Sequence, residues 1–208
     1  MDLKLDKQSV ELIESGESTV QDVIKRVSEQ LKKKNRVISE ILVNGRAIGG
    51  MNDPQLAEMN VRECESLALT SDEPRKLAHK VLYQIAEYMP RIHDALVETS
   101  NKIQSRQENE GMKLLEEIMT TWSVIYQGFR NSLIVTGLNL DQVSVDNKTL
   151  IDVNELIHQK LEIVADLVQA QSYLELSDVL EYELAPLMPL LEEGIYKLIR
   201  EFEKGASG

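Results

Sequence analysis

The spacing of apolar residues changes once along this 208-residue chain, close to Pro74. Before that point, short apolar runs alternate with polar residues around one amphipathic segment at residues 20–31, which is typical of strands packed on a helix. After it, apolar residues recur every three or four positions, which is the period of amphipathic helices. The sequence therefore predicts an α+β protein, with a sheet domain at residues 1–71 and an acidic helical bundle at residues 72–205.

The first domain is predicted to be a small sheet wrapped about one helix. Ser18 or Thr19 offers an N-cap for this helix, and its apolar stripe stops after Leu31. Asn44-Gly45 is the strongest two-residue signal for a β-hairpin. The expected strands cover residues 3–5, 10–13, 37–43, 46–48 and 66–69.

This order of elements is that of a β-grasp, and three segments resemble parts of ubiquitin-like domains. Residues 18–23 (STVQDV) resemble the start of their central helix, residues 41–48 (ILVNGRAI) their strand and Gly-Arg turn, and residues 56–69 (LAEMNVRECESLAL) their closing segment. Conjugated ubiquitin-like proteins end in Gly-Gly after the last strand. Here the chain continues, and Gly49-Gly50 is expected in a loop, so the resemblance implies a binding module and not a protein modifier.

Four apolar stripes predict an antiparallel bundle of about four helices after the boundary at Pro74. Gly111 and Gly137 are expected to end the first two helices, and residues 138–148 are expected to form a crossing loop. The stripes cover residues 78–103, 112–133, 150–168 and 176–202.

Prolines interrupt two of these stripes, because an interior proline removes a backbone hydrogen bond and costs about 3 kcal/mol. Pro90 predicts a kink in the first helix or two abutting helices. Pro186 and Pro189 predict that the fourth helix is either bent or divided into two.

The net charge is -12. Residues 71–208 have ten more acidic than basic residues and account for most of this charge. Such a surface repels phosphate backbones and anionic lipids, so neither nucleic acid nor membrane is an expected partner. Cys64 is the single cysteine and cannot form an intrachain disulfide. No signal-peptide pattern or long apolar span is found in the sequence, so a cytoplasmic location is expected.

The candidates for chemistry are few. Glu155 and His158 have the spacing used in di-iron bundles, but a second such pair is missing, so a solvated pair is expected. Glu63 and Glu65 would raise the pKa of the Cys64 thiol, which is the wrong direction for a nucleophile. The sequence holds no phosphate loop, dinucleotide fingerprint, zinc-type cysteine pair or Ser-His-Asp set. We therefore expect no catalytic residue, metal or cofactor.

Three further groups are candidates for binding. Residues 32–36 form a basic run, expected at the C-terminus of the first helix, where cations favour the helix dipole. Aromatic residues at helical spacing are expected in the core, and become a partner-binding hot spot if the bundle is open along one edge. Acidic residues beside the fourth stripe form either a solvated face or a docking surface for a basic partner. These candidates are Trp122, Tyr126 and Phe129, and Glu175, Asp178 and Glu181.

The favoured function is a non-enzymatic protein-protein interaction or adaptor protein, whose partner is basic or presents an apolar helix. The size, charge and helix pattern are also similar to export chaperones of the flagellin type, without a shared motif. A metal-binding or enzymatic bundle around Glu155 and His158, and a homodimer, remain as further alternatives.

Overall fold

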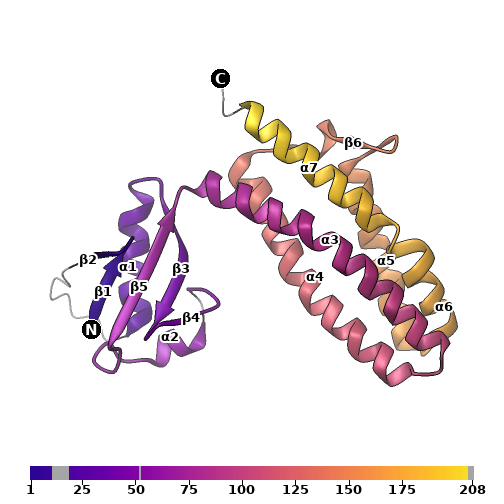
Figure 1. Cartoon of the computed structure of the whole chain (residues 1–208), viewed down its shortest axis with the longest axis horizontal. Coiled ribbons are helices and arrows are strands. Elements are labelled where there is room, and N and C mark those ends of the chain that lie inside the picture. The colour runs from indigo at the N-terminus through magenta and orange to yellow at the C-terminus, as the bar shows by residue number, and fades with distance from the viewer. Residues whose placement is uncertain (11–18, 52, 206–208) are drawn as a thin grey trace. The chain divides into compact units, whose positions relative to one another are not determined.

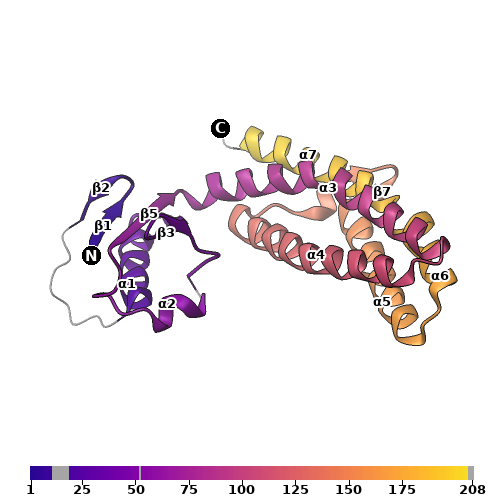
Figure 2. The same cartoon turned by 60° about the horizontal axis from the view of Figure 1, so that its bottom comes forward.

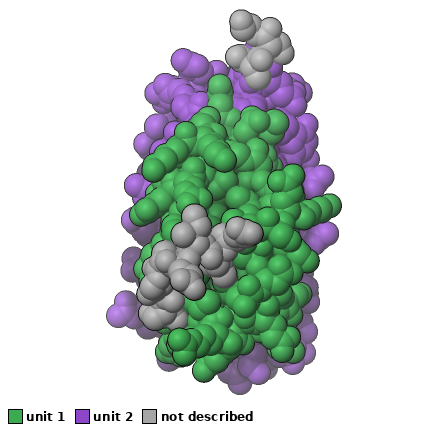
Figure 3. Space-filling view, turned by 90° about the vertical axis from the view of Figure 1, so that its left-hand side faces the viewer, with its two compact units in different colours: residues 1–77 green, residues 78–208 purple. Residues whose placement is uncertain are grey.

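The computed structural model describes residues 1–10, 19–51 and 53–205 and divides the chain into two compact units (Figure 3). We call residues 1–77 the sheet unit and residues 78–208 the helical unit. Each unit has a buried apolar core of its own.

Five strands of the sheet unit form one mixed sheet in the order β2-β1-β5-β3-β4 (Figures 1 and 2). The central pair, β1 and β5, is parallel, and the other neighbouring strands are antiparallel. The sheet and the helices beside it have the β-grasp arrangement, which confirms the predicted α+β class. The elements are β1 (Asp2–Leu5), β2 (Gln8–Ser9), α1 (Val20–Lys32), β3 (Val37–Val43), β4 (Arg46–Ala47), α2 (Pro54–Glu58) and β5 (Ser66–Asp72).

Helix α1 begins where the sequence predicts it. The Thr19 hydroxyl accepts a hydrogen bond from the Asp22 backbone N–H at 3.2 Å, and the Asp22 carboxylate accepts one from the Thr19 N–H at 3.2 Å. This capping box satisfies two N–H groups that have no partner within the helix. Val20, Val23 and Ile24 then turn toward the sheet and are fully buried.

Two turns show where sequence reading of the sheet succeeds and fails. Asn44 and Gly45 adopt φ values of 50° and 78°, so the predicted hairpin between β3 and β4 is confirmed. The second strand, in contrast, lies earlier than residues 10–13. Asp6 and Lys7 make the preceding turn with φ values of 51° and 67°. Non-glycine residues seldom adopt this conformation, and no glycine in the sequence marks the turn. Residues 11–13 of the predicted strand lie outside the described residues.

The turn at Asp6 is fixed by side-chain contacts instead. The Asp6 carboxylate accepts hydrogen bonds from the backbone N–H and the hydroxyl of Ser71, both at 2.7 Å. The Arg36 guanidinium lies 3.5 Å from the same carboxylate and donates to the Ser71 carbonyl at 2.6 Å. This polar cluster ties the β1–β2 turn to the end of β5.

The helical unit is an antiparallel bundle whose long helices match the four predicted stripes (Figures 1 and 2). Short elements, which the apolar stripes did not predict, connect these long helices. The elements are α3 (Pro74–Gln104), α4 (Glu108–Thr136), η1 (Leu140–Gln142), β6 (Ser144–Val145), β7 (Lys148–Thr149), α5 (Leu150–Ala170), α6 (Tyr173–Asp178), the π-helix η2 (Val179–Leu184) and α7 (Leu187–Gly205).

The three prolines behave differently. Helix α3 continues through Pro90, so this residue does not divide it. The predicted fourth helix is divided into α6, η2 and α7. Within η2 the Ala185 N–H donates to the Leu180 carbonyl at 2.9 Å, a bond across five residues. Pro186 precedes α7 and Pro189 lies in its first turn, where a backbone N–H has no helical partner to lose.

One prediction for the connections is wrong, and another is refined. Gly111 does not end a helix but is buried near the start of α4, where an added Cβ would lie 2.7 Å from the Cγ1 of Ile103. Its small size lets α3 and α4 approach just after their turn. Residues 138–148 connect α4 to α5, as predicted, and the connection contains η1 and a β6–β7 hairpin, with Val145 buried in the core.

Candidate functional site

An apolar groove of about 530 Å³ runs between the antiparallel helices α4 and α5, and we call it the α4–α5 groove. Leu115 and Val164 form its floor because their helical spacing turns them toward the core. Two methionines of α4 form one wall, and methionine adapts its shape to irregular partners. The lining residues are Met112, Lys113, Leu115, Glu116, Met119, Leu161, Val164, Ala165 and Val168.

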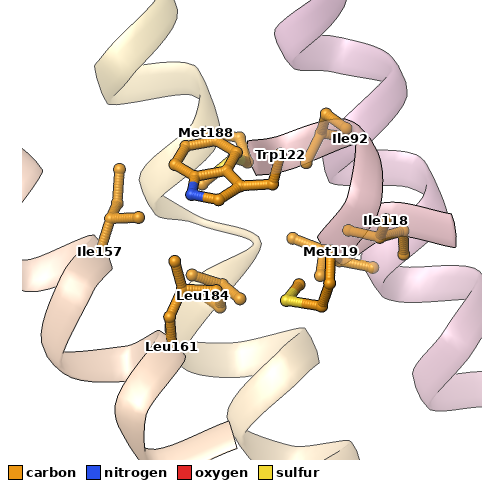
Figure 4. A pocket seen from close by; sticks show the side chains of 9 residues that line it. Ile92, Ile118, Met119, Trp122, Ile157, Leu161, Leu184 and Met188 are labelled. Carbon is orange, nitrogen blue, oxygen red and sulfur yellow. The ribbon is translucent and has the colours of Figure 1, made fainter. Parts of the chain in front are cut away.

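Two side chains are shared by this groove and the bundle interior. Met119 and Leu161 line both the groove and an enclosed apolar cavity of about 10 Å³ beneath it. Figure 4 shows the indole of Trp122 and the side chains of Met119, Leu161 and Leu184 around this cavity. A space of this size and lining stays dry. The indole of Trp122 therefore lies one layer below the groove.

An aromatic contact joins α4 to α5 outside the lining of this groove. The rings of Tyr126 on α4 and His158 on α5 meet edge to face, with centroids 4.7 Å apart and an interplanar angle of 84°. Glu155 is exposed one turn earlier. Within the described ranges, no group of three or more His, Cys, Asp or Glu side chains is placed to hold a metal ion. The described structure thus assigns His158 a packing contact with Tyr126.

The charged side chains that line the groove both come from α4. On α4, Lys113 and Glu116 both line it, so their charges balance. On α5, the exposed Glu162 and Asp166 directly follow the lining residues Leu161 and Ala165. Successive residues of a helix point about 100° apart, so these two carboxylates are turned away from the α5 wall of the groove.

A second apolar groove, of about 620 Å³, lies on the other flank of α4 and is called the α3–α4 groove. Its lining contains no acidic or basic side chain. The Arg91 guanidinium lies 5.5 Å from the ring centre of Tyr88 at its edge, within cation–π range. The lining residues are Val81, Gln84, Ile85, Tyr88, Thr120, Thr121, Val124, Ile125 and Gly128.

The three aromatic candidates from the sequence lie on the same helix at different depths. Trp122 and Phe129 are 8% and 3% exposed and belong to the bundle core. Tyr126 is partly exposed and packs on His158. Of these three aromatic rings, Tyr126 is the one that is accessible at the surface.

The acidic candidates divide in the same way. Glu175 and Asp178 are exposed on α6. Glu181 in η2 instead accepts hydrogen bonds from the Ser100 hydroxyl at 2.8 Å and the Gln104 amide at 3.4 Å. Its carboxylate therefore joins η2 to α3 and is already engaged within the bundle.

Cys64 and the basic run both have structural surroundings in the sheet unit. Cys64 is 2% exposed, and burial, followed by the charge of Glu65, raises the pKa of its thiol. Lys32 and Lys33 occupy the last turn and the C-cap of α1, as predicted. Arg36 is held by Ser71 and Asp6.

Sequence reasoning allowed for a bundle open along one edge but did not locate either groove. It assigned Met112, Met119, Leu161 and Val168 to apolar stripes, but a stripe looks the same whether it faces a neighbouring helix or a gap. The one available signal was the pair of methionines on α4, because flexible side chains are common at adaptable surfaces.

The fold and these grooves define a two-unit protein, a β-grasp sheet followed by a grooved helical bundle. The chain belongs to the family described as domain of unknown function DUF8042, whose model matches residues 80–194. A second model, described as the TP0873 N-terminal domain, matches residues 1–71.

A relative along nearly the whole length is an uncharacterized protein of Treponema pallidum (strain Nichols). It is 23% identical over 205 residues, which cover 94% of this chain and 96% of the relative. No solved structure matches the chain. In the part of the chain that the structure describes, no helix is both long and apolar enough to cross a membrane.

Proposed function

We propose that this chain is a non-enzymatic protein-binding protein whose helical unit holds a helix of its partner in the α4–α5 groove. The observation that carries the proposal is an open groove with an aliphatic and methionine lining on a folded bundle. Contiguous exposed apolar surface of this kind marks interaction sites in soluble proteins.

A helix is the occupant that fits the groove's form. The groove lies between two antiparallel helices, where a third helix completes the packing. An amphipathic helix presents apolar side chains at positions i, i+3 or i+4, and i+7 along one face. The unbranched side chains of Met112 and Met119 adjust to these side chains more readily than branched ones.

The residues of the groove also suit binding of a partner better than catalysis. Lys113 and Glu116 are its only titratable lining residues, and both are exposed to solvent. The Cys64 thiol lies in the other unit, and its raised pKa disfavours the reactive thiolate. These features support a role in which the chain binds a partner without transforming it.

The test uses the single tryptophan as a reporter, because Trp122 lies under the groove. The full chain is titrated with a synthetic amphipathic helical peptide that carries leucines on one face and glutamines elsewhere. We expect a saturable change in Trp122 emission.

A matched pair of variants locates the binding. Ala165 and Ala170 are both exposed on α5, but only Ala165 lines the groove. Ala165→Arg should weaken binding by about tenfold or more, whereas Ala170→Arg should leave it unchanged. Arginine is a good helix former, so neither change should unfold α5. Equal binding by both variants, or no saturable binding by the wild type, would refute the proposed function.

We further propose that the sheet unit is a ubiquitin-like binding module and not a conjugated modifier. Its strand order supports the likeness, and β5 leads within two residues into α3, so the last strand carries no free end. Mass spectrometry of the chain from its host tests this. Cleavage after Gly50 with that residue joined to another protein would overturn it.

A further inference from the structure

We infer that the seam between α3 and α7 binds a positively charged side chain of a partner protein, arginine in preference to lysine. The site consists of two tyrosines and two glutamates, and we call it the tyrosine–glutamate cluster. Its members are Tyr83 and Glu87 on α3, and Glu192 and Tyr196 on α7. None of them lines the α4–α5 groove, so the inference goes beyond the proposed function and does not depend on it.

The register of the seam is fixed by two contacts. Helices α3 and α7 lie side by side and run in opposite directions (Figures 1 and 2). Near the start of α3, Nε2 of His79 lies 3.2 Å from Oε1 of Glu203 at the end of α7. One turn further along α3, the rings of Tyr83 and Tyr196 meet edge to face, with centroids 6.0 Å apart and an interplanar angle of 71°.

The two glutamates come together one turn beyond the tyrosines. Glu87 follows Tyr83 by four positions, and Glu192 precedes Tyr196 by four positions on the helix that runs the other way. Residues four apart share a helix face, so both glutamates lie at one level of the seam. Burial raises the pKa of the Tyr196 hydroxyl, and the charges of Glu192 and Glu87 raise it further. Both carboxylates therefore lie within electrostatic range of one tyrosine hydroxyl.

The chain does not supply a cation for this pair of carboxylates. Neither of the two glutamates forms an ion pair with another residue that the structure describes. Two basic side chains of the same helices are engaged elsewhere, because Arg91 lies over the ring of Tyr88 and Lys197 contacts Glu193. Like charges at one level repel each other, so a cation is the complement that this seam lacks.

The tyrosine rings give a separate preference for a cation. The face of an aromatic ring is electronegative and attracts a cation within about 6 Å of its centre. Tyr83 is 38% exposed, so its ring is accessible from solvent. The His79 ring packs against it, with centroids 5.1 Å apart and an interplanar angle of 66°, and supports its position. A cation at the two carboxylates is therefore adjacent to a supported aromatic surface.

Arginine matches this combination better than other cations do. Its planar guanidinium stacks on aromatic rings and donates several hydrogen bonds to carboxylates, whereas the lysine ammonium is a compact point charge. Metal ions need more ligands, and no group of three or more His, Cys, Asp or Glu side chains within the described part of the chain is placed to hold one.

The weakness of each contact identifies the source of the cation. Exposed ion pairs and exposed cation–π contacts are individually weak, so a free amine would be held only loosely. A side chain of a protein that is already docked on the bundle needs no further binding energy to stay in place. The occupant that these contacts retain is therefore part of a partner protein.

The experiment titrates the full chain with N-acetylarginine amide and follows the ring protons of Tyr83 and Tyr196 by NMR. N-acetylcitrulline amide is the matched probe, because it has nearly the same shape without the charge. We expect saturable shifts of both rings with the arginine probe, half-maximal at concentrations on the order of millimolar. Binding of the citrulline probe should be about tenfold weaker or undetectable.

Paired variants locate the site. Glu87→Gln with Glu192→Gln should weaken binding of the arginine probe by about tenfold. Glu98→Gln with Glu201→Gln is the matched control, because it removes the same charge from exposed positions of the same two helices, and it should bind as the wild type does.

A further variant tests the aromatic part of the cluster. Tyr83→Leu keeps an apolar side chain and removes the aromatic face, so it should weaken binding by about two- to fivefold. Circular dichroism checks that each variant is folded.

Several outcomes would overturn the inference. Equal responses to the arginine and citrulline probes, or an equal loss in the control variant, would assign the shifts to the general charge of the chain. Unchanged binding by Tyr83→Leu would exclude the rings. Half-saturation below about 0.1 mM would assign the site to a free small cation instead of a partner's side chain. Helical-peptide binding at the α4–α5 groove, read by Trp122 emission, should be the same in all these variants, so either proposal can fail while the other stands.

Discussion

The sheet unit and the helical unit differ in how completely they bury their apolar side chains. Among the described residues of the sheet unit, Val10 is the one large hydrophobic side chain that is exposed, at 36%. The helical unit exposes several, of which Leu174, Ile134 and Val124 reach 72%, 71% and 69%. The sheet unit buries nearly all of its large apolar side chains in its own core. The helical unit leaves several of them exposed to solvent.

The difference extends into the helical unit itself. Where α5 begins beside α7, an added Cβ on Gly194 would overlap the Cδ1 of the fully buried Leu150 and lie 3.1 Å from its Cδ2. On the flanks of α4, in contrast, two grooves remain open. The bundle is thus closely packed where α5 meets α7, whereas the two flanks of α4 hold open grooves.

The two units are also spectroscopically distinct. All tryptophan, tyrosine and phenylalanine residues lie between Tyr83 and Phe202, within the helical unit. Trp122 emission therefore monitors the helical unit alone, and hydrogen exchange or far-ultraviolet circular dichroism is needed for the sheet unit. The following predictions use this separation.

The largest effect is expected for Leu67→Ala, at a fully buried position in β5. Removing this side chain leaves a cavity and should destabilise the sheet unit by about 2–5 kcal/mol. Hydrogen exchange in β1, β3 and β5 should accelerate while Trp122 emission stays unchanged. Leu174→Ala, at an exposed position, is the control and should change stability by less than about 0.5 kcal/mol. Parallel loss of both signals would contradict the separation of the two cores.

Gly194→Ala should have the next largest effect on stability. The added methyl group meets Leu150 in a fully packed region, so we expect a loss of about 1–3 kcal/mol in the helical unit. Urea unfolding followed by Trp122 emission measures it. Stability equal to the wild type would show that this side of the bundle has unfilled space, and would weaken the contrast with α4.

Asp6→Asn tests the polar cluster that closes the sheet unit. The backbone N–H and then the hydroxyl of Ser71, with a smaller contribution from Arg36, lower the pKa of Asp6. A lowered folded-state pKa stabilises the protein above the unfolded value of about 3.9, and this stabilisation is lost as the pH falls through the folded-state value.

The variant should therefore cost about 1 kcal/mol at pH 7, because Asp6 is partly exposed, and close to nothing well below pH 3. Asparagine tolerates the positive φ at this turn, so the comparison isolates the charge. Denaturation followed by far-ultraviolet circular dichroism at the two pH values measures the difference. A cost that is independent of pH would exclude the charge as its cause.

The smallest effect, with the opposite sign, is expected for Gly128→Ala. An added Cβ would lie 3.4 Å from the Cγ1 of Val81, which is close to an ordinary contact at the α3–α4 groove. Replacing an interior helical glycine by alanine should then stabilise the helical unit by about 0.5–1 kcal/mol. Trp122-monitored unfolding reports the change, and binding of helical peptides at the α4–α5 groove should stay the same. Destabilisation instead would mean that this flank of α4 is packed more tightly than its groove indicates.

Much of the fold could be predicted from local chemistry. The capping residue Thr19 and the pair Asn44-Gly45 act within a few residues, so their effects are visible in the sequence. The turn at Asp6 could not be predicted, because its partner Ser71 lies at the far end of the unit. The β6–β7 hairpin was missed because strands of two residues have no measurable period.

The candidate site was less predictable than the fold. Trp122 was selected as a surface hot spot or core residue, and the structure places it in the core beneath Met119 and Leu161. The distance between two helices depends on every side chain between them, so no single stripe encodes a groove.

The π-helical turn η2 has a consequence for how chains of this type tolerate length changes. Its wide turn accommodates one residue more than a regular helix would, and α7 begins after Ala185 and Pro186. If the same residues were wound as ordinary helix, the surplus residue would rotate everything downstream by about 100°. Leu191, Ile195 and Leu198 would then turn away from the core they now fill. The wide turn thus absorbs one surplus residue and keeps the last helix in phase, so loss of that residue is compatible with this bundle without a compensating insertion.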